Sequence, residues 1–135
     1  MSYLGLDEKI FYDATKLLKS RGLRRIGLAT SIHHMGVGRH RIAGYKAALD
    51  ENEPFYIANS ANMESLKQKT LDLLLNQKVD ALLCSDHDST LLANRLAYEN
   101  KIKVPSDLQI IGFINGNIAE YLTPSISYVE KSQEV

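Results

Sequence analysis

Apolar runs that alternate with helical segments constrain the fold of this chain more than any other feature. Residues 79–84 and 108–114 are short and mostly apolar, and a helical pattern lies between them. Strands buried on both faces read as continuous apolar runs, and parallel strands need a crossover such as a helix between them. The pattern therefore predicts an α/β protein with a mostly parallel sheet. Polar residues follow each run, at the edge where such sheets bind small ligands.

The same alternation extends through the rest of the chain. Right-handed crossovers place helices on both faces of the sheet, which predicts a three-layer, doubly wound arrangement. Gly22 follows the first helix, Pro54 the second, and Asp88 or Ser89 is expected to cap the fourth. Helices are predicted over residues 8–20, 42–49, 63–74 and 89–100, strands over 26–30, 55–58, 79–84 and 108–114, a loop over 31–39, a turn at 115–117 and an edge strand over 126–129.

Length, charge, cysteine content and the lengths of the apolar runs narrow the class of protein that this chain can be. The chain has 135 residues, enough for one domain with a core of its own. Sixteen basic residues balance sixteen acidic ones, which argues against nucleic-acid binding by this chain alone, apart from local basic patches at residues 21–25 and 39–41. Its one cysteine, Cys84, lies in an apolar run and is expected to be buried. With no membrane-length apolar run and no signal-peptide pattern at residue 1, we expect a cytoplasmic protein.

Three catalytic or cofactor motifs are incomplete. Gly36 and Gly38 follow a predicted strand, but the third glycine of a dinucleotide loop is replaced by Arg41, and no acidic residue follows the second strand. The histidines and nearby aspartates lack the spacing of a zinc site. Ser85 and Ser89 lie near His87, but no nucleophile elbow surrounds them. We therefore expect no cofactor, no metal ion and no catalysis.

Arg41 is the most informative single polar residue. It lies near the start of a predicted helix, beyond the carboxyl end of a predicted strand. A guanidinium there offers two parallel donors to the hydroxyl groups or carboxylate of a ligand. The alternative is an arginine exposed to solvent on the helix surface, and the residues alone favour that alternative.

Several blocks of residues, in order, resemble the LacI/GalR family of bacterial transcriptional regulators. The similarity extends over residues 6–130 and covers one part of such a protein, the C-terminal subdomain of the effector-binding region, which is built like half of a type I periplasmic binding protein. The blocks are Gly22 with Arg25-Ile26, Arg41-x-x-Gly44-Tyr45-x-x-Ala48-Leu49, Asp86, Val104-Pro105-x-Asp107-Leu108, Ile111-Gly112-Phe113 and Leu122-Thr123-Pro124-x-Ile126-Ser127.

The resemblance implies a flavodoxin-like sheet with strand order 2-1-3-4-5. It assigns residues 1–130 to the subdomain and residues 131–135 to the start of a truncated crossover segment. The helix-turn-helix, the hinge helix and the N-terminal subdomain of the family have no counterpart in this chain. Any contact with an operator is therefore expected to involve only the missing DNA-binding part.

The resemblance also implies a site for a small effector, usually a sugar or a nucleobase, in the cleft between two subdomains. By position, Arg41 matches the family's effector-contacting arginine, and Asp86 and His87 match its asparagine-aspartate pair. Ile114 replaces a carboxylate that usually accepts from sugar hydroxyls, and Asn115 is expected to compensate in part. The expected effector-binding residues are Arg41, Asn59, Asp86, His87 and Asn115.

The family dimerises through this subdomain, which implies a homodimer. The interface is expected to use the helix after the third strand and the segment after the fourth, with the side chains of Leu91, Leu92, Arg95, Tyr121 and Leu122. The alternative is that the leucines belong to the core, as expected for one of Leu91 and Leu92.

The resulting hypothesis is an effector-sensing and dimerising part of a LacI-type repressor. Two alternatives remain open at this point. One is a sugar-binding protein of the periplasmic fold with no DNA-binding role. The other is a doubly wound enzyme that uses the cleft near Arg41, His87 and Asn115.

Overall fold

The fold is a five-stranded sheet between two layers of helices. The computed structural model describes residues 5–114 and 116–121. The strands are β1 (Ile26–Thr30), β2 (Tyr56–Asn59), β3 (Ala81–Cys84), β4 (Gln109–Ile114) and β5 (Asn117–Tyr121), in the order β2-β1-β3-β4-β5. The first four are parallel, and β5 runs antiparallel to β4. The predicted fold class and strand order are confirmed.

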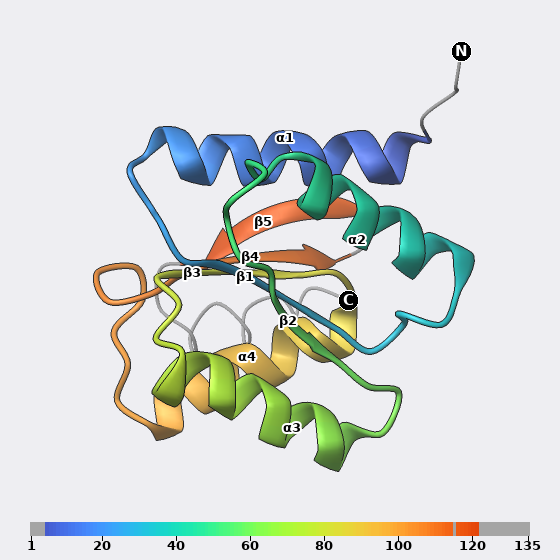
Figure 1. Cartoon of the computed structure of the whole chain (residues 1–135). Helices are drawn as coiled ribbons and strands as arrows, with labels where there is room; N and C mark the ends of the chain where they lie inside the picture. Colours follow the sequence, from blue (N-terminus) through green and yellow to red (C-terminus); the bar gives the residue numbers. More distant parts are fainter. Residues whose placement is uncertain (1–4, 115, 122–135) are drawn as a thin grey trace.

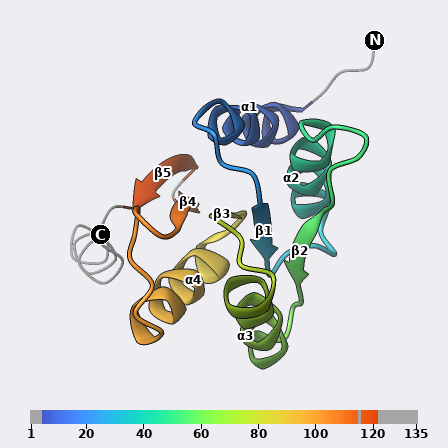
Figure 2. The ribbon, with the colours of Figure 1, turned by 60° about the vertical axis from the view of Figure 1, so that its left-hand side comes forward.

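Two helices cover each face of the sheet (Figures 1 and 2). The helices are α1 (Leu6–Ser20), α2 (Gly36–Ala47), α3 (Met63–Leu71), which continues into the π-helical turn η1 (Asp72–Asn76), and α4 (His87–Glu99). Helices α1 and α2 enclose one core cluster around Phe11, Tyr45 and Phe113. Helices α3 and α4 enclose the other around Leu66, Leu96 and Ile114. None of the helices that the structure describes has the length and apolar character needed to cross a membrane.

Helix α2 begins earlier than predicted, inside the expected loop of residues 31–39. It starts at Gly36, and the backbone packs so closely there that a Cβ atom on Gly38 would lie 1.8 Å from the carbonyl oxygen of Ile32. Glycine is the residue that permits such an approach. Gly38, one of the two glycines that partly match a dinucleotide loop, is therefore explained by tight packing of the loop on helix α2.

The end of the sheet and the start of α4 also differ from prediction. Strand β5 follows the turn at Gly116 directly, whereas the edge strand was predicted at 126–129, outside the described residues. The cap of α4 is Asp86, not Asp88 or Ser89. Asp86 accepts from the backbone N–H of Ser89 while the Ser89 hydroxyl accepts from the backbone N–H of Asp86, which forms a capping box.

A close contact between α1 and α2 positions the polar residues described below. A Cβ atom on Gly44 would lie 2.2 Å from the carbonyl oxygen of Glu8, so only glycine lets the two helix backbones approach this closely. Arg41 lies one turn before Gly44 on α2, and Asp7 precedes Glu8 on α1. The contact therefore brings the side chains of Arg41 and Asp7 together.

Candidate functional site

The candidate site lies at the carboxyl ends of the parallel strands. The segments that follow β1 and β3 leave the sheet at the same edge, because the two strands pair in parallel. We call this edge the carboxyl rim and define it as residues 31–35, residues 85–87 and Arg41. Doubly wound sheets bind ligands at this edge.

Arg41 is buried at the rim and has partners on three elements. Its exposed fraction is 9%. The Nε and Nη2 atoms contact Oδ1 of Asp7 at 2.9 and 2.8 Å, and Nη1 donates to the carbonyl oxygen of Ser85. The guanidinium lies over the ring of Phe113, with 3.9 Å between its central carbon and the ring centroid. Arg41 is thus not a surface arginine, and the alternative that the residues alone favoured is wrong.

Asp86 joins the two segments of the rim. Its carboxylate accepts from the backbone N–H and the hydroxyl of Ser31 after β1. It also accepts from the hydroxyl of Ser85 at 3.1 Å and from the hydroxyl and backbone N–H of Ser89 at 2.9 and 3.2 Å. A carboxylate has about four lone-pair sites. The Asp86 side chain is therefore saturated by partners within this chain.

Hydrogen bonding determines the charge state of Asp86. Its side chain is largely buried, and burial alone would raise its pKa. The hydrogen bonds from Ser31 and Ser89 favour the ionised form and outweigh burial, so the pKa of Asp86 lies below its usual value. The rim thus contains a buried, ionised carboxylate held by neutral donors.

The other predicted effector residues occupy different surroundings. His87 is the first residue of α4 and is exposed at the rim. Asn59 ends β2, at the sheet edge farthest from β5, and is half-buried. Asn115 lies outside the described residues. Ile114 is buried among the residues under α3 and α4, so its side chain belongs to the core and not to the rim.

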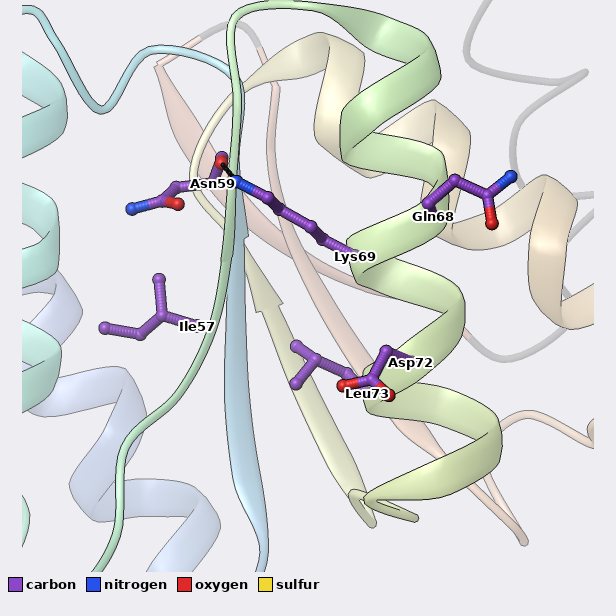
Figure 3. Close-up of a pocket in the computed structure, with 6 residues that line it drawn as sticks. All are labelled: Ile57, Asn59, Gln68, Lys69, Asp72 and Leu73. Carbon is purple, nitrogen blue, oxygen red and sulfur yellow. Dashed lines mark hydrogen bonds between the residues drawn. The ribbon is translucent and has the colours of Figure 1, made fainter.

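A pocket of about 400 Å³ lies between β2 and α3 and includes Asn59. Lys69 crosses from α3 and donates to the carbonyl oxygen of Asn59 at 2.8 Å. Figure 3 shows the amide groups of Asn59 and Gln68 pointing to opposite sides, away from each other. Ligand pockets usually have polar groups that converge on one centre. The carboxyl rim, where polar groups do converge, is the better candidate site.

Comparison with known proteins decides the family. Residues 15–134 match the model of the periplasmic binding protein-like domain. The chain belongs to this family. The resemblance to LacI/GalR regulators is also confirmed, because the relatives are repressors and regulators of transcription.

The relatives of this periplasmic binding protein-like domain are longer than the chain. The ribose operon repressor of Haemophilus influenzae is 30% identical over 124 residues, which cover 87% of this chain and 37% of the repressor. The repressor CytR of Escherichia coli is 30% identical over 124 residues, or 87% and 36% of the two chains. The structure of the Escherichia coli repressor ascG is similar with a TM-score of 0.65 and 26% identity, over 81% of this chain and 42% of that chain.

One face of α4 in this domain presents apolar side chains to solvent. Leu91 is half-buried and lies outside both core clusters, whereas Leu92 packs against the core under α3 and α4. Arg95 is exposed, and Tyr98 has an exposed fraction of 64%. Residues 91, 95 and 98 share a helix face by their spacing. Leu122 and the side chain of Tyr121 lie outside what the structure describes.

Sequence reasoning missed the residues that organise the rim. Asp7, Ser31, Phe113 and the carbonyl of Ser85 hold Arg41 and Asp86 in place. The role of Asp7 requires knowing that α1 and α2 are in contact, which no local pattern reveals. Ser31 and Ser85 each follow an apolar run directly, and this position was the available signal.

The ionised Asp86 predicts a pH dependence of stability. The folded-state pKa is lowered, so its contribution is present above the unfolded-state value of about 3.9 and is lost as pH falls through the folded-state pKa. Asp86→Asn replaces an accepting oxygen with a donor and is expected to lower the free energy of unfolding at pH 7 by about 1–3 kcal/mol. Urea unfolding between pH 7 and pH 3 measures both effects.

The matched control for this prediction is Asp88→Asn, since Asp88 is exposed and lies two residues after Asp86, in the first turn of α4. It is expected to cost only a few tenths of a kcal/mol, through its interaction with the N-terminus of α4. The stability of the Asp86→Asn protein should decline less steeply with acid than that of the Asp88→Asn protein. Equal acid dependence in the two variants would contradict this role of Asp86.

Proposed function

We propose that this chain is the effector-sensing and dimerising part of a LacI-type transcriptional repressor. The observation that carries the proposal is the match to the periplasmic binding protein-like domain together with relatives that are repressors. Those relatives favour a regulator over a free sugar-binding protein. The role as a regulator also places the protein in the cytoplasm, where the DNA is.

The proposal includes the arrangement of the complete regulator. Residues 1–130 form the C-terminal subdomain of the effector-binding region, and residues 131–135 begin the crossover to the other subdomain. The operator is bound by a part of the regulator other than this chain. The zero net charge of the chain agrees with that division. The chain forms one wall of the effector cleft and has no catalytic role.

The effector is bound at the carboxyl rim. Arg41 has five N–H donors. The Nε–H and one N–H of Nη2 face Asp7, and one N–H of Nη1 donates to Ser85. Two N–H groups are therefore left for a ligand. His87 is exposed at the same edge. Asn59 is half-buried and is the last residue of the neighbouring strand β2, where its side-chain amide can contact a ligand. Asp86 fixes the rim by its saturated carboxylate, and Asn115 is proposed as a further contact. The printed name of one relative, a ribose operon repressor, supports a carbohydrate effector.

Isothermal titration of the protein with a panel of pentoses, hexoses, disaccharides and nucleosides tests the proposal. At least one compound is expected to bind saturably. Arg41→Lys keeps the charge but loses the planar fork, so it should weaken that binding by about tenfold. Arg24→Lys is the matched control, because Arg24 is exposed and precedes β1, at the end of the strand opposite the rim, and its effect should stay under about twofold. No binding by any compound, or equal weakening in both variants, would overturn the proposal.

Dimerisation is proposed through the α4 face that includes Leu91, Arg95 and Tyr98. Leu92, Tyr121 and Leu122 were predicted to contribute as well, and Leu92 also packs against the core. An apolar patch flanked by polar residues is typical of a two-fold interface.

Sedimentation velocity tests this interface. Leu91→Glu places a charge at the centre of the patch and should convert dimers to monomers, because burying an unpaired charge is costly. Leu75→Glu, at a comparably apolar site of 41% exposure on η1, is the matched control and should leave the dimer intact. A wild-type protein that is monomeric at all concentrations, or a dimeric Leu91→Glu variant, would exclude the proposed interface.

A further inference from the structure

We infer that Asp7 positions Arg41 and cancels its charge, so that the carboxyl rim selects an uncharged effector over an anionic one. The inference deepens the proposed function and rests on it. Asp7 lies in the first turn of α1, outside the loops that form the rim, and reaches Arg41 because α1 and α2 are in close contact at Gly44.

The geometry of the pair determines which edge of Arg41 is free. The Nε and Nη2 atoms both lie within 3 Å of Oδ1 of Asp7, at 2.9 and 2.8 Å. This edge of the guanidinium is one that binds a carboxylate or phosphate through two parallel hydrogen bonds. Asp7 therefore occupies an edge that an anionic ligand would use. One N–H group on Nη1 and one on Nη2 remain, and because Asp7 already cancels the charge of Arg41, they suit uncharged hydroxyl or carbonyl oxygens.

The plane of the guanidinium is fixed as well. The ring of Phe113 lies against one face at 3.9 Å, the ring of Phe11 lies 5.7 Å away, and the carbonyl oxygen of Ser85 accepts from Nη1. Only 11% of the Arg41 side chain is exposed. Arg41 cannot turn its paired edge toward a ligand without breaking the contact with Asp7.

The buried charges at the rim also disfavour an anion. Arg41 and Asp7 form a neutral pair, and the second buried charge at the rim is the ionised Asp86, whose partners are neutral hydroxyl and N–H groups. An anionic ligand beside Arg41 would meet a cancelled positive charge and a nearby negative one. An uncharged polyhydroxyl compound would avoid this repulsion and accept hydrogen bonds from the two free N–H groups.

The test is a titration of the chain with inorganic phosphate at constant ionic strength, followed through backbone amide shifts in NMR spectra. Asp7→Asn keeps an accepting oxygen for Arg41 but removes the negative charge. It should gain saturable phosphate binding, seen at Ser31, Ser85 and His87, at least about tenfold tighter than any in the wild-type chain. Asp7→Glu keeps the charge and should exclude phosphate as the wild type does.

Asp13→Asn is the matched control. Asp13 lies on the same helix and carries the same charge, but it is exposed and pairs with Lys9. This variant should behave like the wild type. Phosphate binding that is unchanged in Asp7→Asn, or that increases equally in Asp13→Asn, would overturn the inference. If Asp7→Asn does not fold, Asp7→Glu alone tests the inference. Phosphate binding by Asp7→Glu as tight as that expected for Asp7→Asn would overturn the inference, and exclusion of phosphate by Asp7→Glu would support it.

Failure of the inference can be distinguished from failure of the proposed function. The proposed function fails if the wild-type protein binds no member of the panel of carbohydrates and nucleosides. The inference fails in the comparison of phosphate binding between the Asp7 and Asp13 variants, which requires no knowledge of the effector.

Discussion

The buried ion pair between Arg41 and Asp7 is the interaction on which the rest of the candidate site depends. A cation with only 9% of its surface exposed is costly unless its donors are satisfied. Asp7 from α1 pairs with its charge, the Ser85 carbonyl after β3 accepts a hydrogen bond from it, and the ring of Phe113 on β4 lies against its face. Arg41 on α2 thereby links one helix layer to two central strands at the edge where ligands bind. Removing Asp7 would leave the charge of the guanidinium unpaired, and removing any one of the three contacts would loosen its orientation.

A second polar cluster around Asp86 makes the rim rigid in advance of binding. The carboxylate holds the segment after β1, through Ser31, against the start of α4, through Ser89. A preorganised site loses less conformational entropy when a ligand binds. The two clusters therefore have different roles. Asp86 fixes the loops of the rim, and Arg41 presents its remaining N–H donors to a ligand. This division agrees with a domain that forms one wall of a ligand cleft.

Much of the fold was predictable because local patterns and the sheet agree. Residues 26–30 were predicted as a strand with the observed bounds, because the apolar run ends there at a polar residue. The structure buries all of these residues in the sheet. The start of α2 was missed because Gly36 and Gly38 are typical of loops, whereas Gly38 is required by its close approach to the backbone of Ile32. In the site, Arg41 was found from its family position, but Asp7 and Ser31 were not, because their partners lie 34 and 55 residues away in sequence. Hydrogen bonds of that kind depend on tertiary packing, which the sequence pattern does not specify.

The side-chain NMR signal of Arg41 tests the central claim most directly. In the 15N-labelled chain, the Nε–H of Arg41 should give a resolved peak that exchanges with water far more slowly than the Nε–H of the exposed Arg24 and Arg39, because it is buried and bonded to Asp7. An Arg41 Nε–H that exchanges as fast as those of Arg24 and Arg39 would contradict the account, since the guanidinium would then be free in solvent.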